Sequence, residues 1–369
     1  MGSSQPQLSS QGNNGLTHRV YASFCLKEPV ADMNVSNWIE AYGVSDGTRS
    51  YVSSIPGLVE NHVLKDFAMV SIGDFIYIIG GRICEKQRAV SRTCLGIDES
   101  EEHTAFDVEV VSTVWRYNVC SKEWSERAHL NVPRYNFACT THDEKIFVAG
   151  GQSSIGTAKG ISSAEVYDPS QDKWSALPDL NTPRYKSVGV SWKGKIYVIS
   201  GFVGFCDNGY SMFVQYVERS YAEVYDETLK KWYLIPRFWQ LDVPPNQIVA
   251  VGGKLFSSGD CLNSWKGHIE AYDEEINLWS KVKGSKHEIF GYGGNFDHQR
   301  LYLTMTPIGD CMFFLAGYRV QDDCSASSNH VSVIHIFDSS ATQNGWRSFE
   351  PMQLEREHEL CGHCCVAPT

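Results

Sequence analysis

The sequence predicts an all-β protein that repeats one small antiparallel sheet along most of its length. An apolar strand ending in two small residues recurs five times, and an aromatic pair follows each copy. The members of a pair are seven positions apart in four copies and nine in the fifth, whereas consecutive strand ends are 50 to 70 residues apart. A fixed spacing inside a variable period is typical of repeated sheets joined by loops of different length. The strand ends are Gly80-Gly81, Gly150-Gly151, Ser200-Gly201, Ser258-Gly259 and Ala316-Gly317, and the pairs are Tyr117 with Trp124, Tyr167 with Trp174, Tyr225 with Trp232, Tyr272 with Trp279, and Phe337 with Trp346.

The clearest copy of the repeat is 145–174. An apolar strand ends at Gly150-Gly151, a small polar loop follows, and a second strand ends at Tyr167 before the chain turns and reaches Trp174. Its first strand, KIFVAGG, is apolar at consecutive positions, which predicts burial on both faces. We expect the repeated Tyr and Trp residues to pack between neighbouring sheets.

The two ends of the chain each resemble part of one sheet. Residues 17–57 contain segments that match the second, third and fourth strands of the repeat, but no first strand. A match to the missing strand occurs at 360–367, LCGHCCVA. We therefore expect this segment to pair with the strand near Val20, which closes a ring and leaves no free sheet edge between the termini.

The order of apolar strand, Gly-Gly, Tyr and Trp, followed in two copies by Pro133-Arg134 and Pro183-Arg184, resembles the kelch repeat. The resemblance extends from about residue 15 to the end. It implies a six-bladed kelch β-propeller in which three N-terminal strands and one C-terminal strand share a blade. The expected divisions are a disordered leader at 1–14 and a single domain at 15–369, with blade one at 15–57 plus 358–369, blade two at 62–128, blade three at 135–180, blade four at 185–238, blade five at 243–284 and blade six at 285–352.

The amino-acid composition restricts which kinds of binding partner and which cellular compartments are expected. The 32 basic and 43 acidic residues give a net charge of −11 without a basic run, which disfavours nucleic acids and acidic membranes as partners. The twelve cysteines are scattered over a long chain, so we expect reduced thiols. The polar start lacks the apolar core of a signal peptide, and no apolar run is long enough to cross a bilayer. We expect a cytoplasmic or nuclear monomer.

The kelch resemblance also implies a binding face. In kelch domains that capture protein segments, the loops after the Gly-Gly strands and the residues just past Pro-Arg line one face around the axis. Aromatic, amide and charged side chains suit recognition of a protein segment, although an ordinary solvated rim is the alternative for any one residue. The implied residues are Arg82, Gln152, Phe202, Asp260 and Tyr318 after the strands, and Tyr135, Asn136, Tyr185 and Lys186 past Pro-Arg, with Asp66 as the counterpart in blade two.

Residue types that bind metals gather in the last strand. Strict alternation along a strand would place Cys361, His363 and Cys365 on one face. No second Cys/His pair stands at zinc-finger spacing, so we expect a closing strand with small thiols, no metal and no cofactor.

Kelch-type enzymes are the competing interpretation. Galactose-oxidase-like proteins hold copper with Tyr and His, and nitrile-specifier proteins hold iron with Glu, Asp and His at four-residue steps, but neither pattern occurs here. A G-x-S-x-G elbow, a P-loop and a Rossmann glycine motif in its strand-helix context are also missing. A catalytic site, or a small-molecule pocket, assembled in the axial channel without a linear motif stays open.

Two loops exceed the length that the repeat requires. The mixed-charge insert at 82–110 predicts disorder, and the aromatic-rich insert at 202–220 predicts an ordered loop that would roof an axial pocket.

The segment 162–201 looks like plant kelch proteins, many of which carry an N-terminal F-box that docks on a ubiquitin ligase. A polar stretch stands where that box would be, so we expect the recognition half alone. Our hypothesis is a non-catalytic protein-interaction module in a ubiquitin-linked or other regulatory assembly. A specialised-metabolism enzyme or specifier protein of plants is the alternative.

Overall fold

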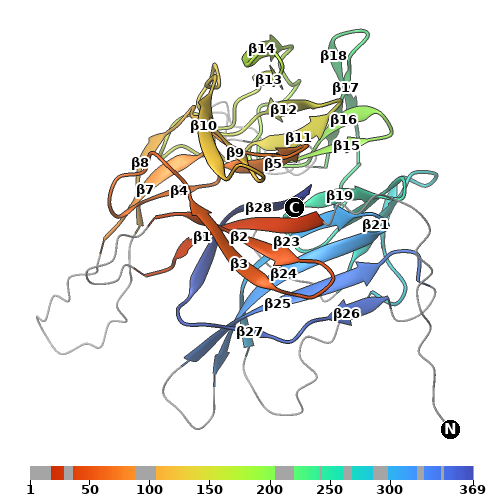
Figure 1. Cartoon of the computed structure of the whole chain (residues 1–369). Helices are drawn as coiled ribbons and strands as arrows, with labels where there is room; N and C mark the ends of the chain where they lie inside the picture. Colours follow the sequence, from red (N-terminus) through yellow and green to blue (C-terminus); the bar gives the residue numbers. More distant parts are fainter. Residues whose placement is uncertain are drawn as a thin grey trace, which may run out of the picture.

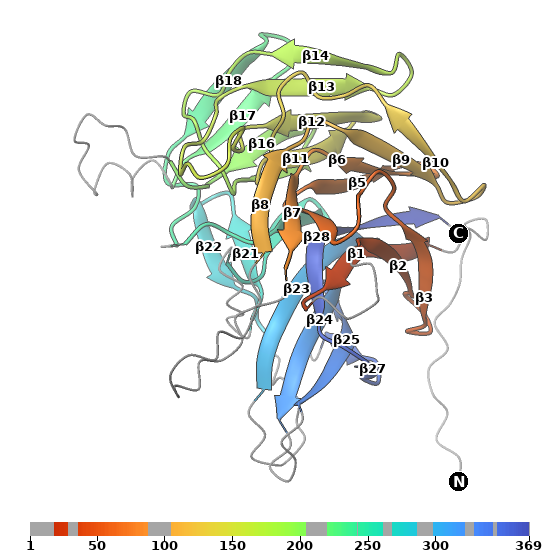
Figure 2. The same cartoon turned by 90° about the vertical axis from the view of Figure 1, so that its left-hand side faces the viewer.

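The computed structural model consists of strands, turns and loops, with no helix in its described part. The prediction of an all-β protein is confirmed, and the fold is a β-propeller of antiparallel sheets (Figures 1 and 2). Within the same described part, no helix is long and apolar enough to span a membrane. The structure describes residues 18–28, 36–87, 105–203, 220–241, 243–260, 268–285, 298–321, 328–341 and 345–368.

One sheet combines both ends of the chain. β28 (His358–Pro368) pairs antiparallel with β1 (His18–Leu26), which is followed by β2 (Trp38–Gly43) and β3 (Arg49–Ser54). Val366 lies opposite Val20 in this pairing. The last strand therefore lies where the sequence match between the two ends predicts it.

Five further antiparallel sheets follow the repeat, four with four strands and one with five, in the part of the chain that the structure describes. In each, neighbouring strands follow one another in chain order, and the first strand lies innermost. The strands are β5 (Ala68–Ile72), β6 (Phe75–Ile79), β9 (Val114–Asn118) and β10 (Glu123–Arg127); β11 (Ala138–His142), β12 (Lys145–Ala149), β13 (Ala164–Asp168) and β14 (Lys173–Leu177); β15 (Val188–Trp192), β16 (Lys195–Ile199), β17 (Ala222–Asp226) and β18 (Lys231–Ile235); β19 (Ile248–Val251), β20 (Lys254–Ser257), β21 (Glu270–Asp273) and β22 (Leu278–Lys281); and β23 (His298–Ile308), β24 (Cys311–Gln321), β25 (Ser328–Asp338), β26 (Trp346–Ser348) and β27 (Met352–Leu354).

The innermost strands contact one another in a series that returns to its start. β28 contacts β5, β5 contacts β11, β11 contacts β15, β15 contacts β19, β19 contacts β23, and β23 contacts β28. Residues of all six strands line one axial cavity of about 740 Å³. The cavity therefore collects side chains that lie far apart in the sequence.

The aromatic pairs hold each sheet against the preceding one. In all five copies the two rings lie opposite each other on paired strands, as Tyr167 does with Trp174, whose ring centroids are 5.0 Å apart. The indole N–H of Trp174 donates to the carbonyl oxygen of Ala128 in the preceding sheet, at 2.8 Å. Trp232 and Trp279 make the equivalent bond. A buried indole needs such an acceptor, so the predicted core role includes a polar link between blades.

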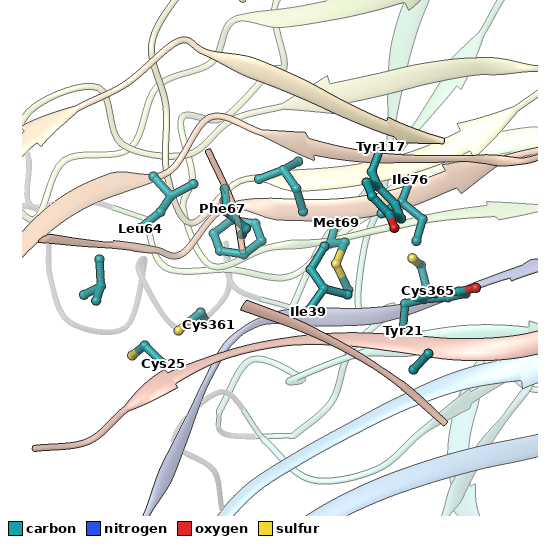
Figure 3. Close-up of a cluster of buried hydrophobic side chains, with 14 of the residues drawn as sticks. Tyr21, Cys25, Ile39, Leu64, Phe67, Met69, Ile76, Tyr117, Cys361 and Cys365 are labelled. Carbon is teal, nitrogen blue, oxygen red and sulfur yellow. The ribbon is translucent and has the colours of Figure 1, made fainter. Parts of the chain in front are cut away.

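A three-stranded sheet outside the repeat consists of β4 (His62–Lys65), β7 (Arg82–Lys86) and β8 (Ala105–Val110). The expectation of disorder at 82–110 is thus wrong at both ends of that insert, because β7 and β8 are strands of this sheet. Cys84 on β7 packs into the same core as Leu64, Phe67 and Cys361, and Figure 3 shows the last three residues in that core. Because β4 pairs with β7, the repeat sheet of the second blade begins at β5. The middle of the insert, the expected leader at 1–14 and residues 204–219 of the aromatic insert lie outside the described residues.

Candidate functional site

The loop face is the name used below for the ten residues implied by the kelch resemblance. Backbone pairing brings its two sets together within a sheet. Tyr135 and Gln152 form an antiparallel bridge, and Tyr185 and Phe202 form the equivalent bridge in the next sheet. The rings of Tyr185 and Phe202 also contact each other, with centroids 5.5 Å apart. Each residue past Pro-Arg therefore lies beside the loop that follows the Gly-ended strand.

The small residues at the strand ends make these bridges possible. Gly150 and Gly151 have φ values of 67° and 96°, a region that L side chains rarely adopt. A Cβ on Gly151 would lie 2.8 Å from the carbonyl oxygen of Tyr135 and 2.7 Å from Cβ of Phe137. The glycine pair therefore allows the loop to approach the backbone of Tyr135.

The positive charge of Arg82, on the loop face, is paired with two nearby carboxylates. Its Nε donates to Asp66 Oδ2 at 2.7 Å, and it also pairs with Asp107. The guanidinium carbon lies 5.3 Å from the ring centroid of Tyr135. Burial lowers the pKa of Arg82, but the charge of Asp66 outweighs that effect and raises it. The side chain therefore anchors the three-stranded sheet to blade three, and its charge is already neutralised.

Loop-face residues differ in how far they reach the surface. Tyr135, Gln152, Asp260 and Tyr318 are only 4 to 8 % exposed, so their side chains pack beneath the surface of the loop face. The side chains that are half-exposed are Arg82, Asn136, Tyr185, Lys186 and Phe202. The sequence pattern assigns both groups to the loop face but does not show which side chains are buried and which are exposed to a partner.

Three loop-face residues occupy equivalent positions at the start of consecutive innermost strands. Asp66, Asn136 and Lys186 all have positive φ, at 55°, 52° and 51°. The N–H of Asn136 donates to the carbonyl oxygen of Asp66 at 3.1 Å, and the N–H of Lys186 donates to that of Asn136 at 2.7 Å. All three line the axial cavity. Among the described residues, the Lys186 ammonium has no carboxylate within ion-pair distance.

Arg300 extends the loop face between the fifth and sixth sheets. It lies opposite Tyr318 on the paired strands β23 and β24. Burial lowers the pKa of Arg300, while the nearby Tyr318 and Asp260 partly oppose that effect. Its Nε is buried without a hydrogen-bond partner among the residues that the structure describes. Such an unsatisfied cationic donor is costly unless a ligand or solvent supplies an acceptor.

The lining of the axial cavity is mixed in character. Small aliphatic residues of the innermost strands alternate with hydroxyl and amide side chains, among them Ser71, Thr140, Ser191 and Gln247. His363 also faces this cavity, and its side chain is exposed there. The cavity thus offers neutral polar groups in its interior, with charged side chains such as Asp66 and Lys186 where the innermost strands begin.

The pairing of β28 with β1 is irregular. Two register shifts interrupt it, between Tyr21 and Ser23 and between Ser23 and Phe24. Cys361 and Cys365 nevertheless share one core cluster and Cys364 belongs to another, as alternation predicts for these three residues. His363, by contrast, is exposed and lines the axial cavity. No group of three metal-ligand residues occurs within the described ranges.

Comparisons with known proteins agree with this architecture. The Kelch motif family model matches residues 133–181. An F-box/kelch-repeat protein of Arabidopsis thaliana is 28 % identical over 204 residues, which cover 54 % of this chain and 49 % of the relative. Kelch-like protein 21 of mouse is 24 % identical over 309 residues, covering 73 % and 45 %. Beta-scruin of Limulus polyphemus is 26 % identical over 232 residues, covering 61 % and 23 %. The chain carries a kelch motif and spans about half the length, or less, of these relatives.

Sequence reasoning missed Arg300 and the charged cluster of Lys65, Lys86 and Glu359. Arg300 lies within 291–306, a segment whose strand pattern has no clear register in the sequence, so its place could not be assigned. Lys65 and Lys86 both contact Glu359, about 270 or more residues away in the chain. Only an expectation of β4 pairing with β7 would have brought them together, and that sheet has no repeat signal.

Proposed function

We propose that the chain is a non-catalytic protein-interaction module that recognises a protein segment on the loop face. The observation that carries the proposal is the hydrogen-bonded series of Asp66, Asn136 and Lys186, which directs polar side chains of consecutive sheets around one cavity. Kelch motifs and kelch-repeat relatives support the same class of function.

The charges of the loop face favour a segment with carboxylate or carbonyl acceptors. Lys186 carries an ammonium group without a partner carboxylate in the described part of the chain, and Arg300 keeps a buried N–H without an acceptor. An acceptor on the partner satisfies both groups and is worth more where water is excluded. The half-exposed rings of Tyr185 and Phe202 supply apolar contact beside Lys186.

The cellular setting follows from the relatives. Two classes of them bear the names F-box/kelch-repeat protein and kelch-like protein. Our proposal includes a place in a regulatory, ubiquitin-linked assembly of the cytoplasm or nucleus, where this chain supplies recognition of the target.

Charge reversal at one loop-face residue tests the proposal. Partners are captured from the native tissue with tagged wild-type chain, with Lys186→Glu, and with Lys173→Glu as a matched control. Lys173 is exposed and pairs with Asp168 at the opposite end of the third blade. The expected result is a protein retained by wild type and Lys173→Glu and lost from Lys186→Glu. Equal retention by all three would reject the loop face as the recognition surface.

A second candidate function is binding or conversion of a small molecule in the axial cavity. Its volume of about 740 Å³ falls within the range of about 300–1,000 Å³ that is usual for ligand pockets. Native mass spectrometry of the chain purified from tissue distinguishes the two functions. A small molecule retained at unit stoichiometry, without a protein partner, would favour this candidate.

A further inference from the structure

We propose that Cys25 on β1 and Cys361 on β28 form an oxidation site at which a hydroperoxide converts two thiols into a disulfide across the composite sheet. The pair lies in the core cluster that joins the chain ends to the three-stranded sheet (Figure 3). A disulfide here would covalently join the first strand of the propeller to the last one. Nothing in the repeat pattern or in the proposed recognition function requires these thiols.

The strand geometry places the two sulfur atoms together. Cys25 lies opposite Glu359, and Phe24 lies opposite Leu360. The next partner of β28 is Gly362, opposite Ser23, so the register shift leaves Cys361 as an extra residue without a partner of its own. Both thiols lie on the same side of the sheet, and Figure 3 shows their sulfur atoms next to each other.

Charged groups beside the pair distinguish the two sulfur atoms. Lys65 Nζ and Lys86 Nζ lie 2.6 and 2.8 Å from the Glu359 carboxylate, and Cys25 Sγ donates to Glu359 Oε2 at 3.8 Å. A hydrogen bond from Cys361 lowers the pKa of Cys25. Burial and the charge of Glu359 oppose this effect, and the two lysines support it, so that the pKa is lowered on balance. Burial raises the pKa of Cys361. Cys25 is therefore the attacking thiolate and Cys361 the thiol that resolves.

The chemistry balances with a hydroperoxide as the only oxidant. The Cys25 thiolate attacks one peroxide oxygen, the O–O bond breaks, and Cys25 becomes a sulfenic acid while hydroxide leaves and takes up the proton that Cys25 released. The Cys361 sulfur then attacks the sulfenic sulfur, the S–O bond breaks, and a second water leaves with the Cys361 proton. Two thiols and one hydrogen peroxide thus give one disulfide and two waters.

The axial cavity provides access for a small oxidant. Cys25 is 0 % and Cys361 6 % exposed, but Cys361 and Glu359 both line the cavity. Hydrogen peroxide is little larger than water, so it can enter where a bulky alkylating reagent cannot. Cys139 lines the same cavity, yet burial raises the pKa of its thiol to about 12. Cys139 is more exposed than either thiol of the pair, so it serves as an internal comparison with greater access and no activation.

The test uses the full-length chain, reduced and then treated with equimolar hydrogen peroxide. Free thiols are alkylated after unfolding, and unreduced proteolytic peptides are identified by mass spectrometry. We expect a linked peptide that contains Cys25 and Cys361, lighter by two hydrogens than the sum of its parts, while Cys139 remains reduced. Because the bond closes a very long loop, the apparent Tm should rise by about 5 °C and return on reduction.

Two variants make the result specific. Cys361→Ser should abolish the link and leave a Cys25 sulfenic acid that dimedone, added during unfolding, traps. Cys120→Ser, at an exposed cysteine, should form the link as wild type does. The wild-type experiment alone decides the matter if Cys361→Ser fails to fold. Absence of the linked peptide from folded wild-type protein, or oxidation of Cys139 as fast as Cys25, would overturn the proposal.

Discussion

Arg134 Nη2 donates a 2.7 Å hydrogen bond to Glu165 Oε1, and the two side chains are 0 % and 3 % exposed. The same guanidinium donates to the carbonyl oxygens of Gly150 and Ser163. It therefore links the segment that leads into blade three with the end of its second strand and the start of its third strand. Since Tyr135 is the next residue, the buried pair also fixes the backbone of the loop face.

Removing the charge of Glu165 should destabilise the fold. Glu165 also accepts hydrogen bonds from the backbone N–H groups of Asn131 and Val132. Glu165→Gln keeps the shape but leaves the buried Arg134 without a carboxylate, so we expect a loss of about 3 kcal/mol in unfolding free energy. Urea unfolding measures it. Glu126→Gln, at an exposed carboxylate in contact with His129, is the control and should change stability little. A stability of Glu165→Gln equal to that of the control would contradict this role.

The indole hydrogen bonds between blades predict a graded effect at Trp174. Trp174→Phe retains much of the ring but leaves the Ala128 carbonyl without its donor, which should cost about 1–2 kcal/mol. Trp174→Ala also creates a cavity and should cost about 3–5 kcal/mol. Both values come from denaturant unfolding. If Trp174→Phe matches wild type, the polar link does not contribute to stability.

Alanine substitutions at Gly151 and Gly194 should distinguish the cost of backbone strain from the cost of a steric clash. Both have positive φ, at 96° and 70°, but an added Cβ meets Tyr135 and Phe137 at Gly151 and nothing within 4 Å at Gly194. Gly194→Ala should therefore cost about 1 kcal/mol, and Gly151→Ala clearly more. Gly151→Ala should also perturb the bridge between Tyr135 and Gln152. Equal losses of thermal stability in the two variants would contradict the close approach described above.

Glu359 should make stability depend on acid pH. Burial raises its pKa, but the ammonium groups of Lys65 and Lys86 outweigh burial and lower the pKa from 4.5 to about 2. A carboxyl with a lowered folded-state pKa stabilises the fold fully above its unfolded pKa. That contribution is lost as the pH falls from about 4.5 towards about 2. The unfolding free energies of wild type and Glu359→Gln should therefore converge as the pH falls over this range. If the two free energies change in parallel with pH, the Glu359 carboxylate does not stabilise the fold.

Much of the repeat could be predicted because its pairing is local. Each Tyr and Trp of a pair face each other across adjacent strands, so the spacing of seven residues already specifies the hairpin between them. The pairing of Val20 with Val366 is distant in sequence, yet the missing first strand and its match near the C-terminus indicated it.

The features that could not be predicted are those that do not belong to the repeat. β4, β7 and β8 form a sheet without counterparts in the other blades, so the cluster around Glu359 had no pattern to reveal it. Tyr135, Gln152, Asp260 and Tyr318 were expected on the loop face but are buried. Their position in a linear motif does not show which neighbouring backbone covers them.

Hydrogen–deuterium exchange with the captured partner tests recognition by the loop face most directly. Amides of peptides spanning Asn136, Lys186 and Phe202 should exchange more slowly when the partner is bound. Peptides at the opposite ends of the blades, 168–173 and 226–231, should be unaffected. Protection confined to those opposite turns, with no change around Lys186, would contradict the account.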